Sequence, residues 1–160
     1  MNKYIKGFLS LILITIFSSC IKDYVSNTET FLINNTNHVI EIYPYTGGFT
    51  DPNSKIIIYP NERISVYKDN VWGKSLKPNY GTLLQPYDSV VIAFDTIYRV
   101  AHRSFRDSAT LCSKCIAFSS NRNISNEESY IETVTKNHKK YLQGYYEYIF
   151  TEDDYNFARQ

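Results

Sequence analysis

The chain has little of what several common functions require. Its 17 Lys and Arg residues nearly balance 16 Asp and Glu residues, so nucleic-acid binding has no electrostatic support. There is no Gly-x-Ser-x-Gly elbow, no glycine-rich phosphate loop and no His-Glu-x-x-His pair. The apolar run over residues 8–17 is too short to span a membrane, which takes about 20 residues. The sequence therefore predicts no nucleic-acid partner, no cofactor and no metal centre.

Residues 1–19 have the three-part form of a secretory signal peptide. Lys3 and Lys6 precede the apolar run, and two serines then lead to Cys20. This end of the chain resembles the lipobox of bacterial lipoproteins, in which a peptidase cuts before a lipidated cysteine. Phe17 stands where leucine is usual, yet its side chain is also too bulky for the −3 position of ordinary signal cleavage. The resemblance implies cleavage before Cys20, whose acyl chains would anchor the protein to a membrane.

The residues after Cys20 indicate whether the lipidated protein is expected in the inner or the outer membrane. Ile21 is not the aspartate associated with retention in the inner membrane, which favours the outer membrane. Residues 21–24 faintly resemble the Lys/Asp-containing signal that sends lipoproteins of bacteroidete-type bacteria to the cell surface, although a short polar linker explains them equally well. We expect a lipidated tether over residues 20–29, with the domain on either the periplasmic face or the cell surface.

The rest of the chain, residues 30–160, is long enough for one domain with a sizeable core. It is rich in tyrosine, with 15 in the whole sequence, and in other residues that pack well on a pleated surface. Short alternating or apolar segments, separated by turn residues, predict strands at 30–34, 38–43, 55–59, 63–67, 89–94, 115–118, 130–135 and 143–150. The first two of these segments, joined by Asn34–Asn37, form the best predicted hairpin.

This pattern predicts an all-β fold, with an antiparallel sandwich of the Ig-like or jelly-roll-like kind as the first choice. Thr151 with Asp154 three residues on approximates a capping box, which predicts a short C-terminal helix. The lipobox, the opening Phe-Leu-Ile-Asn-Asn-Thr at residues 31–36, the Pro60-Asn-Glu turn and the close at residues 148–155 together resemble the small β-rich lipoproteins of bacteroidete-type bacteria. That resemblance implies a location and a fold but no activity.

Cys112 and Cys115 form the most specific motif of the sequence after the lipobox. In an exported protein two cysteines three apart are expected to form a structural disulfide. A thiol-redox role would need the pair at a helix N-terminus, whereas the following Ile-Ala-Phe predicts a strand. Zinc would need four ligands, and His102 and His138 do not stand at finger spacing from the pair.

Carboxylates are the only motivation for an enzyme, and a glycan-acting hydrolase would use two of them flanking a cleft. Glu127, Glu128, Glu132 and residues 152–154 supply candidates. The acids at 152–154 are better explained as favourable charge at a helix N-terminus. The three histidines, His38, His102 and His138, stand among polar or turn residues, which favours solvated side chains.

Aromatic residues give the candidate binding surface. Trp72, Tyr80 and Tyr87 stand in an irregular region and could form a platform for a sugar or a protein ligand, whereas Tyr146 and Tyr148 alternate along a strand and are expected to pack in the sheet. The sequence therefore favours a non-enzymatic, membrane-anchored domain that binds a protein or glycan partner.

Three short motifs suggest a modification. Ser89, Thr96 and Ser108 each follow an aspartate and precede an aliphatic residue, a pattern that resembles the O-glycosylation site of exported proteins in bacteroidete-type bacteria. Asp-Ser and Asp-Thr pairs are also common at turns and strand entries. Ser108, in a loop-like stretch, is the best of the three candidates.

Overall fold

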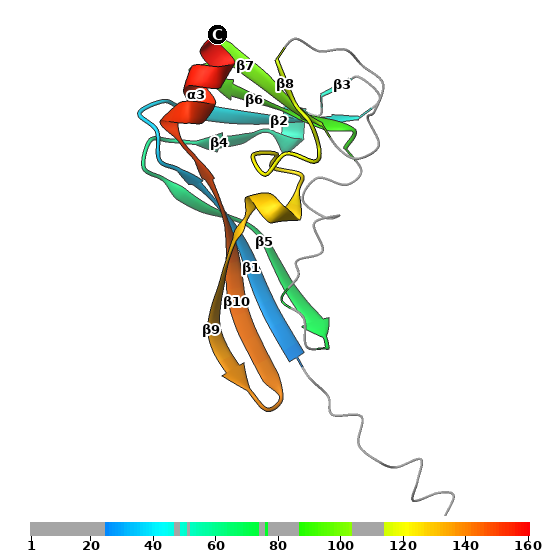
Figure 1. The fold of residues 1–160 in the computed structure, drawn as a ribbon. Coiled ribbons are helices and arrows are strands. Elements are labelled where there is room, and N and C mark those ends of the chain that lie inside the picture. The colour runs from blue at the N-terminus through cyan, green and yellow to red at the C-terminus, as the bar shows by residue number, and fades with distance from the viewer. Residues whose placement is uncertain (1–24, 47–48, 51, 74–75, 77–86, 104–113) are drawn as a thin grey trace, which may run out of the picture.

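The computed structural model describes residues 25–46, 49–50, 52–73, 76, 87–103 and 114–160. Strands make up most of this part of the chain, in two sheets, and a single short helix ends it (Figure 1). The predicted all-β sandwich with a C-terminal helix is thereby confirmed. The elements are β1 (Val25–Asn34), β2 (Ile40–Thr46), β3 (Phe49–Thr50), η1 (Pro52–Ser54), β4 (Ile56–Ile58), β5 (Arg63–Trp72), β6 (Ser89–Phe94), β7 (Tyr98–Arg103), β8 (Cys115–Ile116), η2 (Glu127–Ser129), β9 (Ile131–His138), β10 (Tyr141–Phe150) and α3 (Glu152–Arg159).

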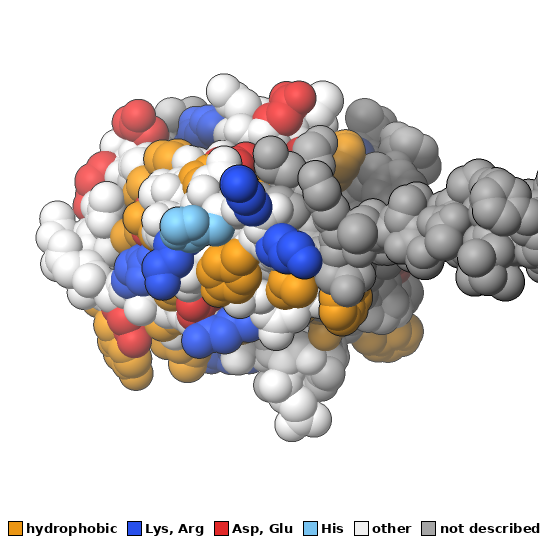
Figure 2. Space-filling model, turned by 90° about the horizontal axis from the view of Figure 1, so that it is seen from below, with side chains coloured by type: hydrophobic (Ala, Val, Ile, Leu, Met, Phe, Trp, Pro, Cys, Tyr) orange, Lys and Arg blue, Asp and Glu red, His pale blue; other side chains and the backbone are white. Residues whose placement is uncertain are grey.

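The two sheets divide the chain unevenly. A four-stranded sheet has the order β5-β1-β10-β9, and a second sheet has the order β3-β2-β6-β7-β8, with β4 also paired to β2. The strands of the four-stranded sheet are long, and in Figure 1 they extend well beyond the second sheet. Figure 2 views the molecule from that extended end, where β1 begins.

The expectation of purely antiparallel sheets is wrong in two places. β1 lies parallel to β10, from Val25 opposite Tyr141 to Asn34 opposite Phe150, and β7 lies parallel to β8. A parallel pair needs a long crossover, and here the crossover between β1 and β10 contains the whole second sheet. The first and last strands of the domain are thus neighbours at the centre of the four-stranded sheet.

The predicted hairpin between residues 30–34 and 38–43 is also wrong. β1 pairs with β10 and β5, whereas β2 pairs with β3, β4 and β6 in the other sheet. The side chain of Asn34 is fully buried at the point where the chain passes from one sheet to the other. It donates to the carbonyls of His38 and Ile58 and accepts from the backbone N–H of Thr36, which satisfies buried backbone groups there.

The domain also begins earlier than expected. Residues 25–29, expected in the tether, form the first half of β1 and pair with residues 141–145 of β10. Ser26 and Thr28, two of these residues, are buried, and their hydroxyls donate to the carbonyls of Gly73 and Leu76. Because these residues are polar, hydrophobic alternation did not indicate the strand, although it is buried on one face.

The main core lies between the two sheets. Alternate residues of β1 and β10, such as Leu32 and Phe150, face side chains of the second sheet such as Ile92 and Phe94. A second, smaller cluster of Leu76, Leu142 and Tyr146 continues along the same face of the extended sheet. The opposite, outer face of the four-stranded sheet therefore remains available for other contacts.

Helix α3 closes the main core at one end. Its buried residue Ala158 joins the core cluster, and the predicted capping pair is present, since the backbone N–H of Thr151 donates to Asp154 Oδ2 at 2.8 Å. The acids of residues 152–154 occupy the first turn, as their interpretation as helix N-terminal charge predicted.

Candidate functional site

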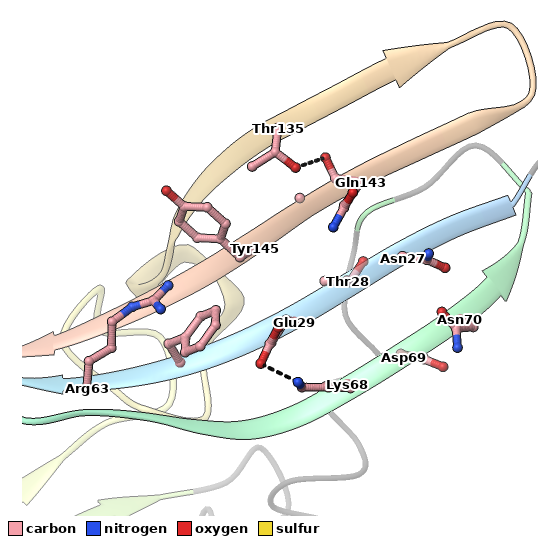
Figure 3. Close-up of a pocket in the computed structure, with 12 residues that line it drawn as sticks. Asn27, Thr28, Glu29, Arg63, Lys68, Asp69, Asn70, Thr135, Gln143 and Tyr145 are labelled. Atoms are coloured by element: carbon pink, nitrogen blue, oxygen red, sulfur yellow. Dashed lines mark hydrogen bonds and ion pairs between the residues drawn. The ribbon is translucent and has the colours of Figure 1, made fainter.

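A groove of about 400 Å³ lies on the outer face of the four-stranded sheet (Figure 3). All four strands contribute to it, and Asn27, Glu29 and Phe31 form its central line because alternate residues of β1 point to this face. The remaining lining residues are Thr28, Arg63, Lys68, Asp69, Asn70, Thr135, Gln143, Gly144 and Tyr145.

Strand pairing places the polar side chains of the groove in rows. Asn27 of β1 lies opposite Gln143 of β10 on one side and Asn70 of β5 on the other, so three amides cross the sheet in one row. Each amide carries both hydrogen-bond donors and an acceptor. The parallel pairing of β1 with β10 is what brings Asn27 and Gln143 together.

A chain of hydrogen bonds orients two of these amides. Asn27 Nδ2 donates to the hydroxyl of Tyr141 at 2.7 Å, and that hydroxyl donates to Gln143 Oε1 at 3.4 Å. Thr135 of β9 adds a hydrogen bond to the backbone carbonyl of Gln143 at 3.1 Å. The chain uses the nitrogen of Asn27 and the oxygen of Gln143, which leaves an acceptor on the first and a donor on the second.

The next row combines charge with an aromatic ring. Glu29 lies between Tyr145 of β10 and Lys68 of β5, and its carboxylate is 3.0 Å from Lys68 Nζ. Burial would raise the pKa of Glu29, but hydrogen bonds from Ser65 and Lys68 and the charges of Lys68 and Arg63 together lower it. Glu29 is therefore an ionised acceptor at neutral pH and not a proton donor.

Arg63 closes one end of the groove (Figure 3). Its guanidinium lies 3.2 Å from the centre of the Phe31 ring and 5.4 Å from that of Tyr145, and its Nε is 3.1 Å from Glu147 Oε1. The Phe31 and Tyr145 rings meet edge to face at 6.0 Å. Cation–π contact, ion pair and ring contact fix the side chains at this end.

The aromatic platform predicted from the sequence can be placed only in part. Trp72 is 75% exposed and ends β5 in the four-stranded sheet, whereas Tyr87 precedes β6 in the other sheet and donates to Ser54 Oγ at 3.0 Å. Tyr80 lies outside the described residues. As predicted, Tyr146 and Tyr148 are buried in the sheet. Tyr145, the groove's own tyrosine, was missed, although it alternates with polar residues on the outer face of β10.

The cysteine pair can be placed only in part. Cys115 and Ile116 form the short strand β8, the first half of the strand predicted over residues 115–118, and no helix of the kind that a redox pair would need begins there. Cys112 lies outside the described residues, and the disulfide between the two stays a prediction. His102 and His138, the other residues considered for zinc, lie on different sheets. Within the described residues no three His, Cys, Asp or Glu side chains form a metal-binding group.

The candidate catalytic carboxylates have structural contacts. Glu132 accepts a hydrogen bond from the Tyr146 hydroxyl at 2.8 Å, and Asp154 accepts from Arg122 and from the Thr151 backbone. Glu152 accepts from the backbone of Asn37. A second cavity of about 250 Å³ lies beside Arg122 and Asp154, whose charges are already paired with each other.

The histidines do not share one environment, so the expectation of three solvated rings is wrong. His102 is 2% exposed and faces the core two positions after Val100 of the same strand. His38 is half-buried, with Nδ1 2.5 Å from Asp95 Oδ2 and its ring stacked on Tyr155. Only His138, near the β9–β10 turn, is exposed.

Two of the three candidate O-glycosylation residues lie in the described part of the chain, and these two differ in exposure. Thr96 is exposed in the tight turn between β6 and β7, where it has a φ of 64°. Ser89 is half-buried and pairs with strands on both sides. Ser108 lies outside the described residues.

The described part of the chain contains no helix of the length and hydropathy that a transmembrane segment needs. Comparisons with protein-family models, curated proteins and solved structures find no match to this chain.

Proposed function

We propose that this chain is an outer-membrane lipoprotein, anchored through Cys20, whose β-domain binds a ligand without catalysing a reaction. The groove on the outer face of the four-stranded sheet is the proposed binding site, and a glycan is the proposed ligand. The anchor is supported by the signal peptide and lipobox pattern at residues 1–20. The domain stands on either the periplasmic face or the cell surface.

The amide row of Asn27, Gln143 and Asn70 is the observation that carries the glycan proposal. Sugar hydroxyls both donate and accept hydrogen bonds, so they match side chains that do the same. The groove's charges balance, since Arg63 and Lys68 stand against Glu29 and Asp69, and a neutral ligand suits that balance. Tyr145 adds an aromatic ring beside the amides.

Binding is favoured over hydrolysis because of the state of Glu29, the carboxylate on the central line of the groove. A glycosidase needs one protonated carboxylic acid, with a raised pKa, opposite a second carboxylate. The pKa of Glu29 is lowered instead, because its hydrogen bonds and the charges of Lys68 and Arg63 outweigh its burial. Among the candidate acids outside the groove, Glu132, Glu152 and Asp154 have the structural contacts described above.

A glycan-binding assay on the purified lipidated protein tests the binding proposal. The protein should bind envelope or dietary polysaccharides, and Asn27→Ala with Gln143→Ala should weaken binding at least tenfold, about 1.4 kcal/mol, by removing hydrogen bonds made on binding. Asn156→Ala is the matched control, because Asn156 is an exposed amide on α3 and far from the groove. Equal binding by the groove variants, or no binding of any glycan by the folded protein, would count against the proposal.

Mass spectrometry of the mature protein tests the anchor separately. The expected N-terminal residue is Cys20 carrying two or more acyl chains, and Cys20→Ser should abolish the modification. An unmodified Cys20, or a mature chain that begins elsewhere, would overturn the anchor while leaving the groove untouched.

A further inference from the structure

The end of the four-stranded sheet at which β1 begins has an unusual set of side chains. The last register positions of its strands form one row across the sheet: Trp72 of β5, Val25 of β1, Tyr141 of β10 and His138 of β9. Trp72 is 75% exposed although it is the only tryptophan of the chain. Most of the ring is therefore available to a partner.

Basic residues surround this row. The turn between β9 and β10 contains Lys139 and Lys140, and Lys136 stands two residues before the end of β9; all three are exposed. The turn is tied to the start of β1, because the Val25 backbone N–H donates to the Lys140 carbonyl at 3.1 Å. Among the described residues within three register positions of this end, Asp69 is the one acid.

Figure 2 views the molecule from this end. Lys and Arg side chains gather there around a histidine and lie directly beside hydrophobic side chains. Acidic side chains stand mostly toward the margin of the view. Cationic and aromatic groups therefore share one small face, which is the combination that membrane interfaces select.

The short distance in sequence between Cys20 and this end of the sheet indicates that the membrane is the partner of this face. Only residues 21–24 separate Cys20 from Val25, the first residue of β1. Even fully extended, the five steps between these residues span at most about 18 Å. A domain held by acyl chains on Cys20 therefore keeps this end of the sheet within that distance of the headgroups.

We infer that this end of the sheet, defined by Trp72, Tyr141, Lys136, Lys139 and Lys140, is a membrane-docking surface that contacts anionic phospholipid headgroups. The inference rests on the lipid anchor of the proposed function. The tryptophan ring enters the interfacial region, where its apolar body and its N–H are both satisfied. The lysines lay their aliphatic stems along the surface and direct their ammonium groups to phosphates.

Docking would orient the groove. Its amide row, at Asn27, lies two residues along β1 from the terminal row, which is about 7 Å. The groove therefore opens just above the headgroups, and ligands attached to or lying on the membrane reach it without crossing much solvent.

Fluorescence of the lipidated protein in vesicles tests this surface directly, since Trp72 is the chain's only tryptophan and all tryptophan emission comes from it. Vesicles are made of phosphatidylcholine alone or with phosphatidylglycerol added. In the anionic vesicles the Trp72 emission should shift to shorter wavelength, be quenched by lipids brominated in their upper acyl chains, and lose quenching by acrylamide. Raised salt should weaken these changes.

Lys139→Gln with Lys140→Gln should lower the ratio of docked to undocked protein about fivefold for each lysine removed. Arg159→Gln is the matched control, because Arg159 is an exposed cation on α3 at the opposite end of the molecule (Figure 1). Circular dichroism should show that the double variant, changed only at exposed turn residues, keeps its fold.

The three possible failures, of the anchor, of the docking surface and of the basic turn, are distinguishable. Mass spectrometry of the same preparation reports whether Cys20 is acylated, and its failure would overturn the anchor. Acylated protein whose Trp72 stays fully accessible to acrylamide in anionic vesicles would overturn the docking surface alone. Equal docking by wild type and the double lysine variant would overturn the role of the basic turn.

Discussion

The Nδ1 atom of His102 accepts a hydrogen bond from the backbone N–H of Ile124 at 3.0 Å. Both residues are buried in the core between the sheets. Because Nδ1 is the acceptor, the ring is neutral and carries its proton on Nε2. Burial lowers the pKa of His102 to about 3, with the charge of Arg122 adding to the effect and that of Asp154 opposing it.

His102 should make the protein sensitive to mild acid. Its pKa is about 6.5 in the unfolded chain, so the stability gained from the neutral ring is complete above that pH and is lost as the pH falls toward 3. Within this window the free energy of unfolding should fall by about 1.4 kcal/mol per pH unit. Urea unfolding at a series of pH values measures this slope. In His102→Gln, whose amide oxygen can accept the Ile124 hydrogen bond, the slope should be absent; an unchanged slope would assign it to other groups.

The ion pair of Glu41 and Lys55 should make the stability of the protein depend on pH at lower pH values than His102 does. Lys55 Nζ is 2.6 Å from Glu41 Oε1, and the hydrogen bonds from Lys55 and then Tyr43 lower the pKa of the buried Glu41 despite its desolvation. This stability is present above the unfolded pKa of about 4.5 and is lost as the pH falls through the lower folded value.

Lys55→Met keeps the aliphatic stem and removes the cation, so it should lower the Tm at neutral pH. The difference from wild type should narrow below the unfolded pKa of Glu41, which thermal melts across the acid range can follow. Lys68→Met is the comparison, since Lys68 pairs with Glu29 but is far more exposed and should matter little to stability. An equal decrease in Tm in the two variants would mean that the burial of Glu41 does not increase the contribution of its ion pair to stability.

Gly144 should not tolerate a side chain. A Cβ at this position would lie 2.6 Å from the carbonyl oxygen of Thr133 and 2.6 Å from Leu76 Cδ1. Because the Thr133 oxygen belongs to the backbone of the neighbouring strand, Gly144→Ala should cost about 1–3 kcal/mol of stability in urea unfolding. Gln143→Ala, one residue earlier and on the opposite face, should cost much less. A fully stable Gly144→Ala variant would require a wider spacing between β9 and β10.

Local sequence patterns predicted most of the strands and the helix, because each of these elements depends mainly on residues that are close together in the sequence. Alternation predicted a strand at residues 143–150, within the observed β10, and Thr151 with Asp154 predicted the helix that follows. Pairing is different, since it joins residues that are distant in sequence. Nothing near Asn34 indicates that β1 pairs with β10, and the nearer hairpin partner was the natural choice.

The candidate site was missed for the same reason. The amide row exists only because β1, β5 and β10 are neighbours, which places Asn27 beside Gln143 and Asn70. The predicted platform consisted of aromatic residues in an irregular region, of which the structure places Trp72 at the end of β5 and Tyr87 before β6 in the other sheet. The burial of His102 could have been predicted from the sequence, because His102 stands two residues after Val100 in a strand whose buried and exposed residues alternate.

The position of β1 also determines how the domain would respond to mechanical load. The strand begins next to the proposed anchor and is bonded along its length to β5 on one side and β10 on the other. A pull on the acyl chains acts along the axis of β1, whereas its hydrogen bonds to β5 lie across that axis. These bonds are then loaded together in shear and cannot be peeled open one by one. The pairing of β1 on both sides would thereby help the proposed attachment point to resist forces between the membrane and a bound ligand.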